Sequence, residues 1–253
     1  MKIAIIGYGK MGHLIETIAK ERGNKVVCII DADNTDDFNT PEFKSADVAI
    51  EFSTPSTAVS NILASFAAGV PVVVGTTGWT DSLPDIKDMC EKGAGTMLWA
   101  SNFSIGVNLF MAFNRYVAAV MNDFPEYSPE MTEIHHIHKL DHPSGTAITL
   151  ADELIGKVDR LNRWEEPQPG KTPNDHALMI NHVREGEVPG THIISWDSSV
   201  DTITLRHEAK SRVGFALGAV KAAEWLKGRK GVLLYGRHAL RGDTYKRTFR
   251  LIY

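Results

Sequence analysis

The sequence predicts an α/β fold in two parts, with a parallel sheet domain first and an α+β domain after it. In the first hundred residues, short apolar runs alternate with segments whose apolar residues recur at helical spacing. This alternation is typical of a parallel sheet covered by helices. Beyond about residue 129, three strand-like runs follow one another with only polar turns between them, which indicates an antiparallel or mixed sheet.

Composition narrows the class of protein. The chain has 253 residues, 43% of them hydrophobic and 23% charged, as in an ordinary globular protein. A net charge of −4 disfavours a protein that binds nucleic acid through bulk electrostatics. Two distant cysteines and the lack of a leader pattern or of a run of about 20 apolar residues favour a soluble, cytoplasmic protein with no membrane partner.

A glycine-rich turn joins the first strand to the first helix. Residues 2–6 form a compact apolar run that reads as a buried strand, residues 13–22 have helical spacing, and residues 25–30 read as a second buried strand. Gly23 is placed to end the helix. The turn in between, residues 7–12, has the form GxGxxG.

This arrangement predicts a Rossmann-type dinucleotide site. Gly7 would permit the tight turn, Gly9 would let the backbone approach a pyrophosphate, and Gly12 would allow close packing of helix on strand. The helix N-terminus offers free N–H groups to the phosphates. Asp31 ends the second strand about 20 residues past the last glycine, where a carboxylate can bind a ribose hydroxyl. The alternative, a glycine turn with no cofactor, stays open.

The α/β alternation continues to about residue 103. Strands are expected over 46–53, 71–75 and 96–100, with helices from a Ser56 N-cap to about Ala68 and near 82–92. Ligands of open α/β sheets lie beyond the carboxyl ends of strands. The small and amide-bearing residues there could contact a nicotinamide or ribose, or could be ordinary turns: Gly75, Thr76, Thr77, Ala100, Ser101, Asn102 and Phe103.

The second half has a different order of elements. We expect a strand over 131–139, a helix that opens at 143–146 and ends at Gly156, and a loop over 157–177. Strands are expected over 177–185, 191–198 and 201–209, a helix over 213–227, and a strand in the tail, 244–253. The last helix and the tail could return to the first domain.

The segment EIHHIHKLDHPSGTA, residues 133–147, carries the strongest chemical signal. His135 and Lys139 would lie roughly 13 Å apart on an extended strand. They can serve one small substrate only if the strand ends near His136 and the chain bends, which the turn formers after Leu140 favour. The next turn, 144–146, would present N–H groups to a carboxylate or phosphate at a helix N-terminus. Together these groups fit a small acidic substrate that needs proton transfer.

Other interpretations of this half are weaker but remain. A zinc site is disfavoured because His136 and His138 have no obvious carboxylate or thiolate partner nearby in the sequence, so no metal is expected. The histidines could also belong to a solvent-facing strand. The charged, glycine-rich segment 184–192 is most simply a hairpin.

Several motifs resemble those of the 4-hydroxy-tetrahydrodipicolinate reductase family, also called dihydrodipicolinate reductases. They are residues 7–12, 51–55, 75–78, 102–106, 135–139 and 143–147, together with Arg184, Gly186, Gly190 and His192. The resemblance implies a nucleotide-binding domain over 1–103 and 213–253, and a substrate-binding and oligomerisation domain over 104–212 that builds a homotetramer. It also implies reduction of a small cyclic dicarboxylate with NAD(P)H in lysine and diaminopimelate biosynthesis.

The resemblance assigns roles to individual residues. His135 matches the family's proton donor or acceptor, and Lys139 its proton donor. Substrate carboxylate contacts match His136, Ser144, Gly145 and Thr146. Cofactor contacts match Gly7, Tyr8, Gly9, Lys10, Met11, Gly12, Asp31, Gly75, Thr76, Thr77, Ala100, Ser101, Asn102 and Phe103.

The chain departs from the family pattern at two places. Many members have Arg where Ile137 stands. Relatives that accept NADPH often have Arg after the ribose-binding acid, whereas Ala32 and Asp33 follow here. A second acid repels a 2′-phosphate, so NADH is expected to be preferred, with NADPH still usable through Lys10. The alternatives are another Rossmann-type dehydrogenase and a non-catalytic nucleotide-binding protein, neither of which accounts for the segment 133–147 as well.

Overall fold

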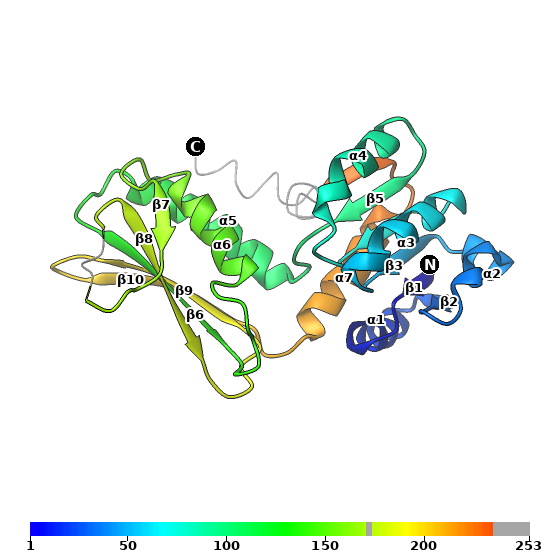
Figure 1. The fold of residues 1–253 in the computed structure, drawn as a ribbon, viewed down its shortest axis with the longest axis horizontal. Coiled ribbons are helices and arrows are strands. Elements are labelled where there is room, and N and C mark those ends of the chain that lie inside the picture. Colours follow the sequence, from blue (N-terminus) through cyan, green and yellow to red (C-terminus); the bar gives the residue numbers. More distant parts are fainter. Residues whose placement is uncertain (171–173, 235–253) are drawn as a thin grey trace. The chain divides into compact units, whose positions relative to one another are not determined.

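The computed structural model describes residues 1–170 and 174–234, which fall into two units (Figure 1). The first unit contains Met1–Ser104 and the described residues from Val213 to Leu234, and the second contains Ile105–Arg212. The expected strand in the tail, 244–253, lies outside the described residues. Among those that are described, no helix is long and apolar enough to cross a membrane.

The first unit is built on a six-stranded parallel sheet of order β11-β5-β4-β3-β1-β2. The inner strands are buried because helices cover both faces, which explains their uninterrupted apolar runs, whereas the edge strand β2 is mostly half-buried. In chain order they are β1 (Lys2–Ile6), β2 (Lys25–Ile30), β3 (Val48–Glu51), β4 (Val72–Val74), β5 (Thr96–Trp99) and β11 (Gly231–Leu234).

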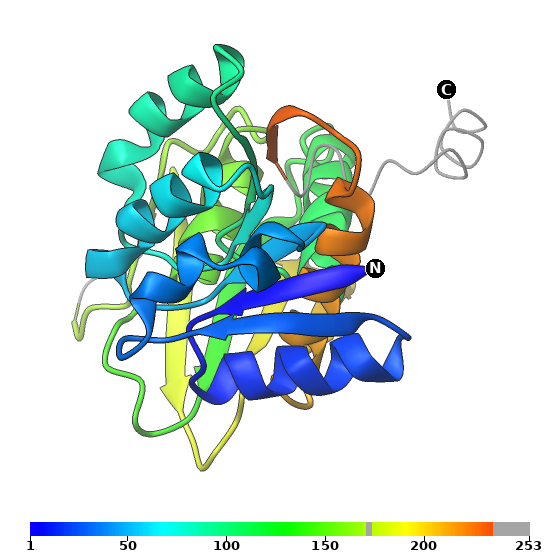
Figure 2. The same cartoon turned by 90° about the vertical axis from the view of Figure 1, so that its right-hand side faces the viewer.

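Two layers of helices cover this sheet (Figure 2). One face packs against α1 (Lys10–Glu21) and α7 (Val213–Leu226). The other face packs against α3 (Pro55–Ala67) and α4 (Leu83–Glu91), and short turns of helix lie nearby: η1 (Thr35–Asn39), α2 (Pro41–Lys44) and η2 (Thr80–Ser82).

The parallel α/β fold expected from the sequence is confirmed, with local corrections. Strands β3, β4 and β5 are shorter than expected, because pairing stops where the chain turns into the site. The N-cap position of helix α3 is Thr54 rather than Ser56, and the Thr54 side chain makes no capping hydrogen bond. Pro55 takes the first helical position, where its missing N–H costs nothing. The short helices η1, α2 and η2 and strand β11 were not predicted.

The second unit contains a mixed five-stranded sheet of order β10-β9-β6-β8-β7. Strand β6 pairs in parallel with β8 and antiparallel with β9. The strands are β6 (Ser128–His135), β7 (Arg163–Glu165), β8 (Ala177–Arg184), β9 (Thr191–Asp197) and β10 (Thr202–Glu208). The expectation of a single loop over 157–177 was wrong, because the short strand β7 joins the edge of the sheet beside β8.

Two helices pack on one face of this second sheet: α5 (Ile105–Met121) and α6 (Gly145–Ile155). Helix α6 begins and ends where the sequence predicts. Helix α5 was missed, although its buried residues recur at helical spacing: Val107, Phe110, Met111, Asn114, Ala118 and Met121. Met131 of β6 shares its buried core with these helices, so they pack behind the strand that leads into the turn.

Candidate active site

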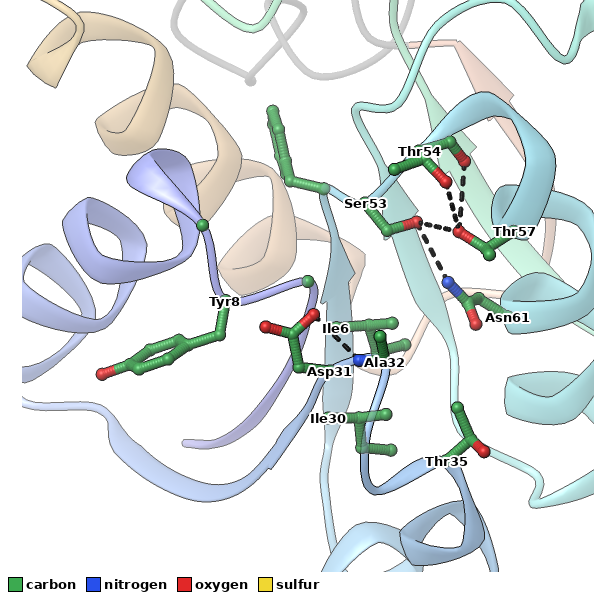
Figure 3. Close-up of a pocket in the computed structure, with 13 residues that line it drawn as sticks. Ile6, Tyr8, Ile30, Asp31, Ala32, Thr35, Ser53, Thr54, Thr57 and Asn61 are labelled. Atoms are coloured by element: carbon green, nitrogen blue, oxygen red, sulfur yellow. Dashed lines mark hydrogen bonds between the residues drawn. The ribbon is translucent and has the colours of Figure 1, made fainter.

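A cavity of about 310 Å³ lies at the carboxyl ends of β1, β2 and β3 in the first unit (Figure 3). Gly7 and Gly9 border it from the turn after β1, Asp31 from the end of β2, and Ser53 from the end of β3. This is the edge of a parallel sheet at which nucleotides bind.

The three glycines of the motif are needed for different reasons. Gly7 has φ +87°, and an added Cβ would stand 2.2 Å from the carbonyl oxygen of Phe52. An added Cβ at Gly12 would stand 2.4 Å from the carbonyl oxygen of Gly7. The fold itself therefore demands glycine at both positions. At Gly9 an added Cβ meets nothing within 4 Å, so only a ligand would need that space.

The N-terminus of α1 fits a phosphate group. Gly9 is its N-cap and provides no side-chain cap, and the first turn contains no acidic residue. The first N–H groups of the helix therefore lack a side-chain acceptor, and the positive end of the helix dipole faces the cavity. Lys10 and Met11 occupy this first turn.

Asp31 is held in place at the edge of the cavity. Its carboxylate accepts a hydrogen bond from the Ala32 N–H at 3.0 Å, and its own N–H donates to Asn34 Oδ1 at 2.7 Å. Asp31 is the one charged side chain among the residues that line this cavity. A fixed carboxylate suits a ribose diol and opposes a 2′-phosphate.

A polar cluster that the sequence analysis did not identify lines the opposite wall. Ser53 Oγ lies 3.0 Å from Thr57 Oγ1 and accepts a hydrogen bond from Asn61 Nδ2 at 3.0 Å. Thr54 Oγ1 lies 2.9 Å from Thr57 Oγ1. Figure 3 shows these side chains directed toward one another beside the cavity. The spacing of Thr57 and Asn61, one turn apart on α3, was the available signal.

Gly75 and Thr76 do not line the cavity themselves but contact two residues that do, Phe52 and Ser53. An added Cβ at Gly75 would stand 2.1 Å from the ring of Phe52, so the glycine makes room for that ring. Thr76 Oγ1 accepts a hydrogen bond from the Ser53 N–H at 2.8 Å, which fixes the turn after β3. Thr77 is exposed beside them.

The residues after β5 lie at the next strand end. Phe103 is buried, and its ring centroid is 5.9 Å from that of Phe52. Asn102 Oδ1 accepts a hydrogen bond from the Ser104 N–H at 2.8 Å. Ala100 is buried, and Ser101 is exposed. None of these residues borders the cavity, so any contact with a cofactor would be made beyond it.

In the second unit, strand β6 ends at His135, four residues before the end of the strand expected over 131–139, and the chain then turns, as a site shared by His135 and Lys139 requires. The Lys139 N–H donates to the His136 carbonyl at 3.1 Å, which closes the turn. The His135 carbonyl accepts from the Glu185 N–H at 2.8 Å, and the Ile137 N–H donates to the Gly186 carbonyl at 3.1 Å. The segment 184–192 is therefore not the expected hairpin: β6 lies between β8 and β9, so this segment is a loop that crosses the end of β6 and supports the turn.

Arg184 joins this turn to the interior of the sheet. Its Nη2 donates to Glu133 Oε1 at 3.1 Å and to the Asp141 carbonyl at 2.7 Å, and its Nε donates to the Lys139 carbonyl at 3.1 Å. Glu133 is fully buried, and its Oε2 also accepts from the Ser144 N–H at 3.1 Å. One ion pair thus fixes both the start of α6 and the backbone that carries Lys139.

The protonation of Glu133 follows from this environment. Burial alone would raise the pKa of Glu133, but hydrogen bonds from Ser144 and Arg184 outweigh that effect and hold the pKa below its ordinary value. The carboxylate is therefore ionised at neutral pH, and its negative charge acts on a neighbouring imidazole.

That imidazole belongs to His135, which is buried on the same face. Its Nδ1 lies 3.4 Å from Glu133 Oε2, and among the described residues it has no hydrogen-bond partner. Burial lowers the pKa of His135, the Glu133 carboxylate raises it in part, and Lys139 and Arg184 lower it further. His135 is consequently neutral at neutral pH and close to several cations.

A second buried imidazole, His192, stands against the first. The two ring centroids are 5.3 Å apart in an edge-to-face arrangement. Burial, and then the neighbouring His135, lower the pKa of His192 to about 4. Gly190 leaves space beside this pair, because an added Cβ there would stand 3.1 Å from His135 Nε2.

Lys139 reaches outward from the same turn. Its Nζ lies 2.7 Å from both carboxylate oxygens of Asp141, and 20% of its side chain is exposed. The ammonium group therefore already binds one carboxylate, in the manner in which it could bind a carboxylate of a ligand.

The N-terminus of α6 provides an anion-binding position. Ser144 Oγ accepts the Ala147 N–H at 3.2 Å, so this hydroxyl caps the helix rather than pointing away from it. Gly145 is exposed, and an added Cβ there meets nothing within 4 Å. Thr146 is half-buried in the first turn, and no acidic residue opposes an anion there.

The histidines that the sequence analysis considered for a metal do not converge on one point. His138 Nε2 pairs with Glu187 at 2.9 Å, and the rings of His136 and His138 are 5.9 Å apart. The tertiary structure instead brings together two other groups with metal-ligating atoms: Glu133, His135 and His192, and separately His142, Glu166 and His182.

Comparison with known proteins decides the family. The family model for the dihydrodipicolinate reductase N-terminus matches residues 1–103, and that for its C-terminus matches residues 106–239. The chain belongs to the dihydrodipicolinate reductase family.

Relatives within this reductase family are similar over most of the chain. One from Christiangramia forsetii, a 4-hydroxy-tetrahydrodipicolinate reductase, is 44% identical over 92% of this chain and 95% of its own. Another of the same name from Archaeoglobus fulgidus is 35% identical over 89% and 94%. The solved structure of a dipicolinate-bound dihydrodipicolinate reductase from Paenisporosarcina sp. TG-14 shares the fold, with TM-score 0.75 and 24% identity over 94% of this chain and 99% of that one.

Sequence reasoning on this reductase missed Glu133 and the part played by Arg184. The signal for Glu133 was present, because alternate residues of a strand share a face and Glu133 is two residues before His135. Arg184 was noted only as part of a motif. Its partners Glu133, Lys139 and Asp141 come from a strand and a turn more than 40 residues away, which spacing along the chain could not reveal.

Proposed function

We propose that this chain reduces 4-hydroxy-tetrahydrodipicolinate to tetrahydrodipicolinate in lysine and diaminopimelate biosynthesis, with a nicotinamide cofactor as the hydride source. The observation that carries the proposal is the clamp made by Arg184 and Glu133. This clamp assembles His135, the Lys139 turn and the start of α6 in one unit. Such a set provides a proton carrier, a cation and an anion-binding helix end for a small dicarboxylate.

The nucleotide would be held in the first unit. The uncapped N-terminus of α1 fits the pyrophosphate, the open space at Gly9 fits its close approach, and the Asp31 carboxylate fits a ribose diol. When bound, the reduced nicotinamide supplies the hydride. Residues 75–77 and 100–103, at the neighbouring strand ends, are proposed to complete the contacts.

The acid would be held in the second unit. The Lys139 ammonium and the N–H groups of Gly145 and Thr146 are suited to its two carboxylates, with His136 beside them. Ser144 contributes by capping α6 and so directing those N–H groups outward. Because Lys139 is already paired with Asp141, we propose that substrate replaces Asp141 as its partner.

The same groups would transfer the proton that the reaction needs. The reaction replaces the 4-hydroxyl group, which leaves as water, by a hydride, and it consumes one proton overall. A nearby donor can supply that proton and stabilise the negative charge that hydride addition leaves on the substrate. Lys139 is the cationic donor, and His135, kept neutral by burial, can pass a proton while Glu133 faces its Nδ1. Both proton transfers can therefore be made by side chains described in the second unit.

The direct test of the activity is an optical assay of NADH oxidation with freshly generated 4-hydroxy-tetrahydrodipicolinate. Consumption of NADH that depends on this substrate is expected. If NADH is not consumed, another dehydrogenase activity or a non-catalytic nucleotide-binding role takes the place of this proposal.

The roles of His135 and Lys139 are tested by substitution. His135→Ala and Lys139→Ala should each lower kcat by roughly a hundredfold or more, as loss of a general acid–base group does. His176→Ala, at an exposed histidine of the same unit that bonds the Arg160 carbonyl, is the matched control. Rates near that of the unsubstituted enzyme in either active-site variant would remove the assigned role.

Preference for NADH over NADPH is proposed from the charge of the nucleotide cavity. Asp31 is its one charged lining residue, and the exposed Asp33 follows close behind. NADPH remains usable, since Lys10 begins α1 beside the cavity. The measurement is kcat/KM for each cofactor, and a tenfold advantage for NADPH would overturn the preference.

A homotetramer in the cytoplasm is proposed for the assembled enzyme. Within the described part of the second unit, helices pack on one face of the sheet only, and the other face carries half-buried or exposed apolar residues such as Ile134, Val183 and Ile193. An uncovered face of this kind suits a second sheet. Light scattering after gel filtration measures the mass, and a monomer would contradict the proposal.

A further inference from the structure

Three side chains of the second unit converge outside the groups assigned above. His142 precedes α6, Glu166 directly follows β7, and His182 lies near the end of β8. His142 Nδ1 lies 2.9 Å from Glu166 Oε2, and His182 Nδ1 lies 3.3 Å from the same oxygen. The two imidazole rings stack with their centroids 4.1 Å apart. We call these three residues the His–Glu–His cluster.

We propose that the His–Glu–His cluster is a binding site for a divalent transition-metal ion of the zinc type. Bonds of about 2.05 Å at the tetrahedral angle place ligand atoms roughly 3.3 Å apart. Of the two separations that involve Glu166, the one to His182 is 3.3 Å and the one to His142 is 2.9 Å, somewhat shorter. All three ligand atoms lie within 4.8 Å of one another, and rotation of the two surface rings would close the remaining gap.

The chemistry of the donors selects the class of ion. Two imidazole nitrogens and one carboxylate oxygen suit Zn²⁺, Co²⁺ or Ni²⁺, whereas Ca²⁺ and Mg²⁺ prefer oxygen ligands alone. The side chains of His142, His182 and Glu166 are 49%, 34% and 25% exposed. An ion can therefore enter from solvent and keep water as its fourth ligand.

The buried group of Glu133, His135 and His192 is the rival place for such an ion. Its carboxylate already pairs with the Arg184 guanidinium, so an added dication would face a cation at close range. Among the described residues, by contrast, no lysine or arginine pairs with Glu166. The charge balance therefore favours the His–Glu–His cluster.

An ion there would tie the turn before α6 to strand β8 and to the end of the edge strand β7. His142 directly precedes Pro143 and Ser144, and His182 belongs to β8. The inference does not depend on the proposed function. It departs from the expectation that no metal binds, because the three ligands come from segments that are distant in sequence.

The test uses Co²⁺ as a spectroscopic probe on the full chain after treatment with a chelator and desalting. We expect one equivalent of Co²⁺ per chain to produce the visible ligand-field absorption of a tetrahedral site, and Zn²⁺ to abolish it by displacement. His182→Ala and Glu166→Gln should each weaken binding by about tenfold or more, since even loss of an outer-shell partner has an effect of that size.

His138→Ala is the matched control, because His138 pairs with Glu187 at the surface but has no third ligand close by among the described residues. Its Co²⁺ affinity should equal that of the unsubstituted chain. The proposal is overturned if no saturable Co²⁺ spectrum appears, or if the spectrum persists unchanged in His182→Ala and Glu166→Gln. Neither outcome bears on reductase activity.

Discussion

Glu133 and Arg184 form an ion pair of 3.1 Å in which the carboxylate is fully buried. The pair links β6 to β8, and through the guanidinium it also holds the carbonyls of Lys139 and Asp141. The arrangement of the proposed proton-transfer groups therefore depends on a residue that touches neither the proposed substrate nor the cofactor. Glu133 is a positioning residue in this scheme.

Replacement of Glu133 by Gln tests that role. Because the Glu133 carboxylate raises the pKa of His135, the pKa of His135 should fall further in the variant. The free energy of unfolding should also fall, by about 2–3 kcal/mol, which is less than for a fully buried pair because Arg184 keeps its carbonyl acceptors. Histidine resonances followed by NMR across pH give the first quantity, and urea unfolding gives the second.

The exposed Glu187→Gln variant is the control for this experiment, since Glu187 contacts His138 and not His135. A His135 pKa that is equal in the Glu133→Gln and Glu187→Gln variants would contradict the electrostatic part of the argument, even if stability had changed.

His192 should make the protein less stable in mild acid. Its pKa is about 4 in the folded protein and about 6.5 when unfolded, so between these values the unfolded chain binds the proton more readily. The free energy of unfolding should fall as pH decreases from about 6.5 to about 4, by about 3 kcal/mol in total, and should lose this contribution to the slope below that range.

Urea unfolding of His192→Gln at several pH values measures this effect. In this variant the free energy of unfolding should depend less steeply on pH. The remaining dependence should come from His135 and His207, whose pKa values are also lowered by burial. A variant whose slope matches that of the unsubstituted protein between pH 6.5 and 4 would show that His192 is not the buried neutral base described above.

Asp141→Asn should strengthen binding of the acid substrate. In the free enzyme Asp141 occupies the Lys139 ammonium at 2.7 Å, and the proposed substrate must displace it. An exposed pair of this kind contributes up to about 1 kcal/mol, so KM should fall by up to about fivefold with kcat little changed. Steady-state kinetics decide the point, and an increase in KM would mean that Asp141 assists binding instead.

The glycines of the nucleotide turn separate stability from ligand binding. Gly7→Ala should destabilise the fold, because φ is +87° and the new Cβ would meet the Phe52 carbonyl at 2.2 Å. Gly9→Ala should leave the melting temperature nearly unchanged, since nothing lies within 4 Å, yet weaken NADH binding by about tenfold or more. Thermal melts and fluorescence titration with NADH measure the two effects.

Normal NADH affinity in Gly9→Ala would show that the pyrophosphate does not approach this position. The paired design matters, because loss of binding in Gly7→Ala alone could follow from a damaged fold.

The sequence by itself determined the elements whose signals are local. Apolar runs, helical spacing and turn glycines placed β1, α1, β2 and α6 because each of these patterns is set by neighbours within a few residues. The turn formers after Leu140 indicated a bend there, but the strand expected over 131–139 ends already at His135. Helix α5 had a usable local pattern and was missed, whereas β7 and β11 are too short to be recognised without the strands they pair with.

Only the tertiary structure decided which side chains meet. Glu133 and Arg184 are brought together by the parallel pairing of β6 with β8, whose register no local pattern specifies. His142, from the turn before α6, likewise meets His182 of β8 only in the folded chain. The ring of Phe52, a neighbour of Gly75 only in the fold, explains why Gly75 lacks a side chain. Burial of ionisable groups and pairing between distant segments are properties of the folded chain, so their consequences for charge and for ligand binding become visible only there.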